Sequence, residues 1–388
     1  YFKKSNKAQP NNPNILFNLA LALQGTGKVD KAKKIYLDLI LINSKDVKSY
    51  YGLFILDIKN ITDQLLKNLE LIMRENKISL FEKSLINFMF SKLAKKNDNL
   101  KEEINFLKLA HQNCYNSNIT FNSQSDFYYK NIISKNFDKI IFEGNYEKLA
   151  DFNNQSHIFI IGLPRSGSTL VETIISHNET NINSVGEFHG FNRSILEQIG
   201  MAIYAKNFDY KNYKLMINRK KFQEALLEKY NNFEKKIYLD KSLENFFNIE
   251  IILEFFPNAK FIHTYRKFND AVIGIYQTML PELSWTHKIK DIINYIGIYN
   301  KTVDYFRKKY PKKILDVQLN KLSNQKEVEV KKILDFCNIK YGNDYLDFDE
   351  NNKLSNKTSS FLQVRNKIKE YELNKYQPYF YLLDKEDN

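Results

Sequence analysis

One stretch, residues 157–170, constrains the fold and the chemistry of this chain more than any other. A continuous apolar run of strand length ends at Gly162, and a Pro-Arg-Ser-Gly turn leads into a predicted helix, Thr169–Ser176. Four residues separate this glycine from the next, the spacing of a phosphate-binding loop, and unpaired N–H groups at a helix start attract anions. Ser168 stands where a nucleotide-hydrolysing loop has lysine. The sequence therefore predicts a phosphate cradle in which Arg165 supplies the positive charge.

The length and composition set broad limits on the protein. With 388 residues the chain can form more than one domain, and its first residue, tyrosine rather than methionine, predicts a fragment of a longer protein. There is no apolar run of 18 residues and no signal-peptide pattern, so we expect no membrane association. Cys114 and Cys337 lack metal-ligand or redox spacing, which favours a reducing, cytoplasmic location and predicts no metal site.

The net charge of +13 raises the question of a nucleic-acid partner. The basic residues are dispersed along the chain, and lysine, asparagine, isoleucine, tyrosine and phenylalanine are abundant together, as expected of an AT-rich genome. We therefore expect no nucleic-acid binding. A positive surface also attracts an anionic cofactor.

Residues 14–41 contain two apolar helical patterns separated by Gly-Thr-Gly, which predicts a helix-turn-helix. Small residues, Ala20 and Ala32, would allow the two helices to approach closely. The pattern resembles one tetratricopeptide repeat, and residues 1–10 resemble the closing helix of a preceding repeat. A generic helical hairpin is the alternative. A single repeat cannot bury its own apolar face and must stack on a neighbour.

The chain is predicted to have three parts: a repeat fragment at 1–44, a helical connector at 45–150 and an α/β domain at 151–388. In the connector, Ile78–Lys95 and Leu100–Cys114 have the periodicity of amphipathic helices, and Asn116–Ser125, rich in asparagine and serine, is predicted as a loop.

Short strand patterns alternate with helical stretches after residue 157. The predicted strands are 236–240, 260–265 and 313–317, in addition to the run before the phosphate loop. This alternation predicts an α/β fold with a P-loop-like parallel sheet flanked by helices. Ligands in such sheets bind beyond the carboxyl ends of the strands.

The phosphate loop resembles the 5′-phosphosulfate-binding segment of sulfotransferases, and the likeness continues to the end of the chain. With the repeat pattern, the chain resembles the tetratricopeptide-repeat sulfotransferases, bacterial relatives of the protein-tyrosine sulfotransferases. This resemblance implies 3′-phosphoadenosine-5′-phosphosulfate (PAPS) as sulfuryl donor. It also implies that the loop residues bind this cofactor, namely Arg165, Ser166, Gly167, Ser168, Thr169 and Leu170.

The same resemblance implies the catalytic residues. Glu187, in a predicted Gly-Glu turn, matches the general base of the family; a surface glutamate is the alternative, and His189 is a rival base. Lys241, in a segment that resembles Asp-Lys-Met-Pro-x-Asn-Phe, matches the lysine that contacts the sulfonate and the bridging oxygen. Ser360, in Thr-Ser-Ser-x-x-Gln-Val-Arg, matches the serine that assists the transferring group, and Arg165 contributes charge.

The implied 3′-phosphate site departs from the family pattern. Arg266 is present after its strand, but Gly274 stands where the family has a serine that binds the phosphate. One phosphate hydrogen bond is therefore expected to be lost, which puts the affinity for the cofactor in doubt. His263, in the preceding strand, is expected to pack rather than to act in catalysis.

Three further residues are candidate cofactor ligands. Tyr299, with Tyr295 on the same helix face, resembles an aromatic that packs near adenine, although a core stripe explains the pair equally well. Arg365 follows the Gln-Val pair, and Lys375 matches a basic residue before an expected tryptophan, here Tyr376. Solvation of a lysine- and asparagine-rich tail is the alternative for these two.

We therefore expect a sulfotransferase that moves a sulfuryl group from PAPS to a hydroxyl of a protein tyrosine, a saccharide or a small molecule. The helical part could present a protein or peptide acceptor, or pair two chains into a homodimer. The alternatives are a catalytically impaired sulfotransferase-like scaffold, which Gly274 favours, and a phosphate-loop kinase, which the missing loop lysine opposes.

Overall fold

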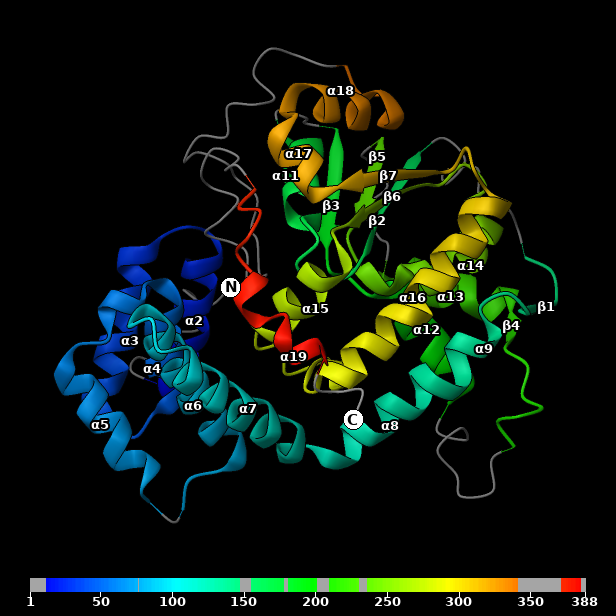
Figure 1. The fold of residues 1–388 in the computed structure, drawn as a ribbon. Helices are drawn as coiled ribbons and strands as arrows, with labels where there is room; N and C mark the ends of the chain where they lie inside the picture. The colour runs from blue at the N-terminus through cyan, green and yellow to red at the C-terminus, as the bar shows by residue number, and fades with distance from the viewer. Residues whose placement is uncertain are drawn as a thin grey trace. The chain divides into compact units, whose positions relative to one another are not determined.

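A computed structural model of the chain describes residues 12–75, 77–146, 155–177, 181–200, 209–229, 236–340 and 371–384. The described residues form two compact units (Figure 1). The first comprises residues up to Asn122 together with Met279–His287, and the second comprises the other described residues. The predicted domain boundaries at residues 44 and 150 stay predictions; the expected connector contributes residues to both units.

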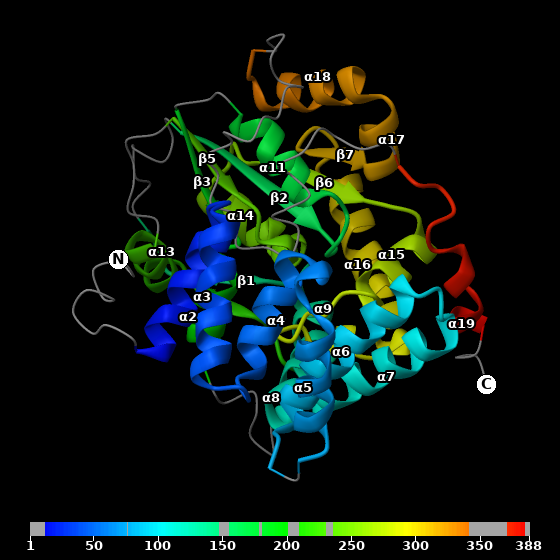
Figure 2. The same ribbon diagram turned by 90° about the vertical axis from the view of Figure 1, so that its left-hand side faces the viewer.

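The first unit begins with a helical hairpin. Helices α2 (Pro13–Gly25) and α3 (Val29–Ile42) pack against each other, as Figure 2 shows. Ala20 and Ala32 are fully buried, as their small size in the sequence indicated. Gly27, in the turn, has a φ of 76°, a left-handed conformation that favours glycine. The predicted helix-turn-helix is confirmed.

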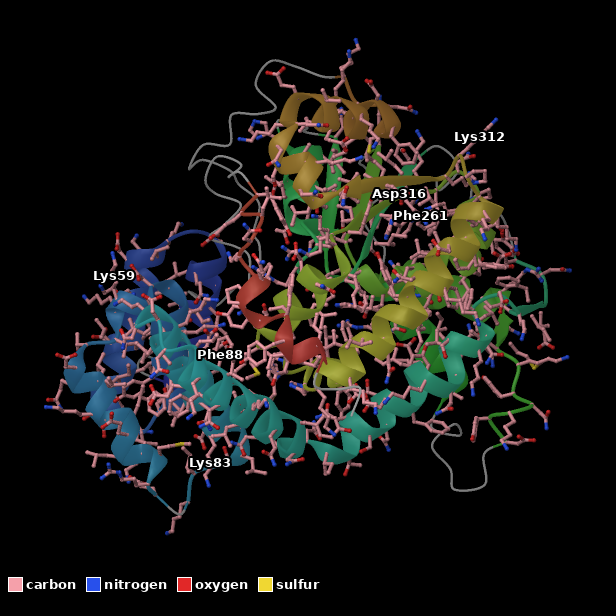
Figure 3. The ribbon with its side chains drawn as sticks, in the orientation of Figure 1. Lys59, Lys83, Phe88, Phe261, Lys312 and Asp316 are labelled. Carbon is pink, nitrogen blue, oxygen red and sulfur yellow. The ribbon has the colours of Figure 1, made fainter. Side chains whose placement is uncertain are left out.

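Four more α-helices lie in the described part of this unit, namely α4 (Val47–Leu56), α5 (Asp63–Met73), α6 (Leu80–Lys96) and α7 (Leu100–Ser117). Ser79 and Glu82 form a capping box that starts α6. Phe88, labelled in Figure 3, is buried on α6, where the sequence predicted an apolar stripe. Both amphipathic helices predicted in this region are confirmed.

The loop predicted for Asn116–Ser125 is wrong. Helix α7 continues to Ser117, and α8 (Ile119–Phe127) follows after one residue. The side-chain amide of Asn122 donates to the backbone carbonyl of Tyr115 at 2.8 Å, and the Ser117 hydroxyl donates to a carbonyl one turn back. Polar side chains that hydrogen-bond helix carbonyls allow a composition typical of loops to form helix here.

The segment Met279–His287 belongs to the first unit, although it lies in the sequence between helices α15 (Phe268–Tyr276) and α16 (Ile289–Lys309). Trp285, in the middle of the segment, is buried. The Nδ1 atoms of His287 and His111 on α7 are 3.0 Å apart, a hydrogen bond in which one ring donates to the other. Burial lowers the pKa of His287 to about 4, which keeps this ring neutral at physiological pH.

The second unit contains a five-stranded sheet with the strand order β3-β5-β2-β6-β7, in which all neighbouring strands are parallel. The strands are β2 (Ser156–Gly162), β3 (Ile182–Gly186), β5 (Ile237–Asp240), β6 (Lys260–Tyr265) and β7 (Ile314–Gln318). The predicted parallel sheet and four of its strands are confirmed. Strand β3 lies where the sequence predicted a turn. Its Asn183 and Ser184 are polar, which indicated a turn, but polar residues also suit a half-buried strand at the edge of a sheet.

Alternate residues of the central strands build two different cores. Ile158, Ile160 and Ile262 pack in an aliphatic cluster with α11 (Ser168–Ser176) and α18 (Lys326–Cys337). On the other face, the ring of Phe159 stacks on Phe261, which Figure 3 labels on β6. The sheet is therefore covered on both faces, and its functional groups are left at the strand ends.

The remaining helices with defined bounds are α9 (Ser134–Asn136), α12 (Gly190–Ile199), α13 (Arg219–Lys229), α14 (Ile249–Phe255), α17 (Leu319–Asn324) and α19 (Tyr381–Asp384). Two short strands that the sequence analysis did not predict, β1 (Ile141–Glu143) and β4 (Met216–Asn218), pair in parallel as a second sheet. None of the helices in the described ranges is long and apolar enough to cross a bilayer.

Candidate active site

The phosphate loop joins the central strand β2 to helix α11, as predicted. Gly162, at the strand end, has a φ of 153°, and a Cβ there would lie 2.4 Å from the backbone oxygen of Thr264. Gly167, just before the helix, has a φ of 93°, and a Cβ there would meet Leu319 at 2.6 Å. Both glycines are therefore required by backbone conformation and by close approach. The loop they form directs the N-terminus of α11 towards the edge of the sheet.

The loop side chains have different tasks. The Ser166 hydroxyl is buried, donates to the carbonyl of Leu163 at 2.7 Å and lies 2.7 Å from the hydroxyl of Thr264. This hydroxyl therefore stabilises the loop from inside. Only the backbone N–H of Ser166 is suited to bind an anion. Ser168 and Thr169 are buried in the first turn of α11, and Leu170 packs against the aliphatic core.

Arg165 lies next to a second arginine. It has a φ of 65°, and its carbonyl accepts a hydrogen bond of 3.1 Å from Nη1 of Arg266. Burial lowers the pKa of Arg165; Tyr376 opposes this shift, and the positive charge of Arg266 adds to it. Two neighbouring half-buried cations repel each other, and an anion placed between them would relieve the repulsion. The structure thus brings together the two arginines predicted to bind phosphate groups.

Lys241 and Glu187 form the other half of the site. Lys241 follows β5, is 1% exposed, and its Nζ lies 2.7 Å from Oε1 of Glu187, which follows β3. The Glu187 side chain is 43% exposed, so that its carboxylate remains accessible from solvent. The sequence predicted both residues as catalytic, and their direct contact places an accessible carboxylate on a buried ammonium group.

A second carboxylate, Glu172, was missed by the sequence analysis. It lies on α11, is buried, accepts a hydrogen bond of 2.7 Å from Ser184 and has Oε2 3.7 Å from Nζ of Lys241. Burial raises the pKa of Glu172, while the charge of Lys241 opposes this shift. A carboxylate within an otherwise apolar helix, Leu170-Val171-Glu172-Thr173-Ile174-Ile175, is the signal that could have identified it.

His189, the rival base, is committed to another partner. Its Nδ1 lies 3.0 Å from Oε1 of Glu244, and this hydrogen bond raises the pKa of His189. Although burial alone would raise it, the hydrogen bond from His189 lowers the pKa of Glu244. A histidine whose Nδ1 is already hydrogen-bonded to a carboxylate is a weaker candidate for the general base, so Glu187 is the better candidate.

Arg266 lies among aromatic residues. Its Nη2 donates to the hydroxyl of Tyr371 at 2.9 Å, and its guanidinium carbon lies 4.9 Å from the ring centre of Tyr376. The Tyr371 hydroxyl in turn donates to the buried carboxylate of Asp270. The Nε atom of Arg266 is buried without a hydrogen-bond partner in the described part of the chain. The guanidinium group of Arg266 thus retains an N–H, at Nε, that can donate to a further hydrogen-bond acceptor.

The remaining predicted ligands lie in three kinds of surroundings. Tyr299 is buried in the core, where its hydroxyl contacts His263 and its ring lies edge-on to Phe246, an arrangement that fits the core-stripe interpretation. Lys375 is on the surface, with a long ion pair of 3.9 Å to Glu372. Two of the predicted residues fall outside the described ranges, namely Ser360 and Arg365.

His263 packs within its strand, as expected. Its Nδ1 is 2.6 Å from a carboxylate oxygen of Asp316, which is labelled in Figure 3, and its ring stacks on Tyr265. Arg307 also donates to this carboxylate, at 3.0 Å. These contacts explain the burial of a histidine in β6 without a catalytic role.

Four neighbouring strands each end in one part of the site. In the strand order β3-β5-β2-β6, the turns that follow carry Glu187, Lys241, the phosphate loop and Arg266. Gly186 is paired with Asp240, and Gly162 with Thr264, so these strand ends lie at one edge of the sheet. The family comparison agrees with this arrangement: residues 157–343 match the model of the sulfotransferase family. Residues 157–343 form a sulfotransferase-family domain.

Other comparisons extend this finding. Residues 1–34 match a tetratricopeptide repeat, so the predicted combination of a repeat with a sulfotransferase domain is confirmed. An uncharacterized protein of Aquifex aeolicus (strain VF5) is 24% identical over 395 residues, which cover 94% of this chain and 48% of that protein. The chain thus spans about half the length of the curated relative it matches.

Solved sulfotransferases superpose on the chain only in part. The sulfotransferase domain of the Synechococcus PCC 7002 olefin synthase is 16% identical, with a TM-score of 0.40, and covers 60% of this chain and 91% of its own. A sulfotransferase of Mycobacterium tuberculosis H37Rv is 11% identical, with a TM-score of 0.35, and covers 73% and 91%. The assignment of the domain depends on the family match and the strand order rather than on these superpositions.

Proposed function

We propose that this chain is a sulfotransferase that moves a sulfuryl group from PAPS to an acceptor hydroxyl, with Glu187 as general base. The observation that carries the proposal is the convergence of Glu187, Lys241, the phosphate loop and Arg266 at adjacent strand ends. Two anion subsites, one at the start of α11 and one at Arg266, match the two phosphate groups of this nucleotide.

The residues of the site fit such a donor. Gly162 and Gly167 keep the loop backbone free of side chains, and the positive charges of Arg165 and Arg266 lie next to each other. Arg266 also has an unpaired Nε. These features suit a ligand with two anionic groups, and PAPS supplies an activated sulfonate on a phosphate leaving group.

In the proposed mechanism the loop N–H groups and Arg165 hold the 5′-phosphosulfate end. Lys241 donates a hydrogen bond to the oxygen between sulfur and phosphorus, where negative charge builds as the S–O bond breaks. The oxygen of the acceptor hydroxyl forms the new bond to sulfur, and Glu187 accepts the proton of this hydroxyl. The leaving group is adenosine 3′,5′-bisphosphate. Each well-placed donor of this kind lowers the barrier by about 3 kcal/mol.

The two carboxylates around Lys241 have separate roles in this proposal. Glu187 is accessible and must leave Lys241 in order to act as a base, whereas Glu172 is buried and stays as counter-ion. Without Glu172, release of Glu187 would leave a buried ammonium group uncompensated, at a large cost. Glu172 is therefore a positioning residue that allows Lys241 to change partners.

The impaired-scaffold alternative has one observation in its favour, since the hydroxyl of Tyr371 already contacts Arg266 beside Gly274. Isothermal titration separates the alternatives. We expect adenosine 3′,5′-bisphosphate to bind and ATP with Mg²⁺ to bind far more weakly; binding of ATP alone would contradict the proposal, and binding of neither would favour the scaffold.

A transfer assay tests the base. Glu187→Gln should leave the affinity for adenosine 3′,5′-bisphosphate nearly intact and lower the rate of transfer at least a hundredfold, because proton abstraction contributes about 10²–10⁴ in rate. An unchanged rate would remove Glu187 from this role.

The acceptor is proposed to be a protein or peptide that binds the helical repeats. Mass spectrometry of host extract treated with enzyme and PAPS would detect the acceptor as a sulfated product.

A further inference from the structure

The glycine at position 274 has a structural reason. A Cβ at this position would lie 2.9 Å from Nη1 of Arg266 and 3.4 Å from the hydroxyl oxygen of Tyr376. A side chain at this position would therefore displace the guanidinium group, and a serine hydroxyl, one bond beyond the Cβ, would compete with the tyrosine hydroxyl for the same space. Gly274 makes room for Tyr376.

The two tyrosines near Arg266 differ in what their hydroxyls can still do. A phenol has one proton to donate. Tyr371 donates its proton to Asp270 while it accepts from Arg266. Tyr376 also accepts a hydrogen bond from Arg266, but none of the described residues accepts its proton. Among the described residues, Tyr376 is thus the tyrosine beside Arg266 whose hydroxyl proton has no acceptor.

We infer that the Tyr376 hydroxyl donates a hydrogen bond to the 3′-phosphate of the nucleotide, in the place that a serine at position 274 would take. The inference rests on the proposed function, in which Arg266 binds this phosphate. Tyr376 is 8% exposed, so its ring is fixed in place before the ligand arrives, and its position next to a guanidinium group suits a doubly charged anion. The missing serine is therefore replaced rather than lost.

The inference predicts a selective effect on recognition of the 3′-phosphate. For the wild-type chain and for Tyr376→Phe, the dissociation constants of adenosine 3′,5′-bisphosphate and adenosine 5′-phosphate are measured by titration calorimetry. We expect Tyr376→Phe to weaken binding of the bisphosphate about tenfold, as for a lost hydrogen bond to a charged group, and to leave the affinity for the monophosphate unchanged. Tyr381→Phe, a partly exposed tyrosine of the same segment, is the matched control.

The outcomes distinguish this inference from the proposed function. If the wild-type chain does not prefer the bisphosphate, the 3′-phosphate site itself is wrong and both ideas fall. If the wild type prefers the bisphosphate and Tyr376→Phe retains the same preference, only the role of Tyr376 is refuted.

Discussion

The partner of Lys241 that is most open to a quantitative test is Glu172. The two charges are 3.7 Å apart, which corresponds to an attraction of about 4.5 kcal/mol at an effective dielectric constant of about 20. Replacement by glutamine removes this attraction and also relieves the cost of burying the carboxylate. Because Glu187 remains 2.7 Å from the ammonium group, we expect a net loss of about 2–3 kcal/mol, below the roughly 3–5 kcal/mol typical of a lone buried pair.

Thermal unfolding of Glu172→Gln measures this loss. For a unit of this size, about 2–3 kcal/mol lowers the melting temperature by roughly 5–10 °C. Glu187→Gln is the matched control, because its carboxylate is 43% exposed and water screens part of its interaction with Lys241, so that its removal should cost less than that of Glu172. Transfer activity should fall in both variants, but Glu172→Gln should lose more stability. If Glu172→Gln had the same melting temperature as the wild type, Lys241 would not depend on Glu172 as a counter-ion. The proposed division of roles between Glu172 and Glu187 would then be refuted.

Two further predictions concern the sheet. Gly162→Ala should destabilise the chain by about 3 kcal/mol and abolish nucleotide binding, because the new Cβ would lie 2.4 Å from the rigid carbonyl oxygen of Thr264. Gly200→Ala should cost only about 1–2 kcal/mol, because Gly200 has a φ of 66° but no atom of the described residues lies within 4 Å of a Cβ there. Equal melting temperatures for the two variants would contradict this prediction. His157 stacks on Phe256, and burial lowers its pKa to about 4. The unfolded chain therefore binds more protons below pH 6.5, and stability should fall by about 3 kcal/mol between pH 6.5 and pH 4 through this residue. His157→Phe should lose correspondingly less stability in thermal melts at pH 7 and pH 4.5; an equal loss would refute the assignment.

Much of the fold was predictable because local patterns and tertiary packing agree. The apolar runs that became β2 and β6 are buried on both faces, and such runs have no other stable place in a chain of this size. Strand β3 was not predictable, since its Asn183 and Ser184 indicate a turn unless a neighbouring strand pairs with them. Helix α8 was missed for the same reason: the contact of Asn122 with Tyr115 exists only after folding.

The candidate site was predictable where a residue follows a strand in a recognisable motif, as Glu187, Lys241 and Arg266 do. The sequence did not indicate what these groups contact. Glu172 and Lys241, which form an ion pair, are about 70 residues apart in the sequence. Arg266 and Tyr376, whose side chains are in contact, also come from distant segments of the sequence. Contacts between distant segments depend on the topology of the sheet, which no local pattern contains.

The segment Met279–His287 has a practical consequence for any attempt to isolate the sulfotransferase domain. Although this segment lies inside the range that matches the family, its Trp285 is buried in the helical unit and its His287 is hydrogen-bonded to His111 there. A shortened protein that begins near residue 150 would leave His287 without its histidine partner. Expression of the helices and the catalytic part as a single piece is therefore the safer strategy for biochemical work.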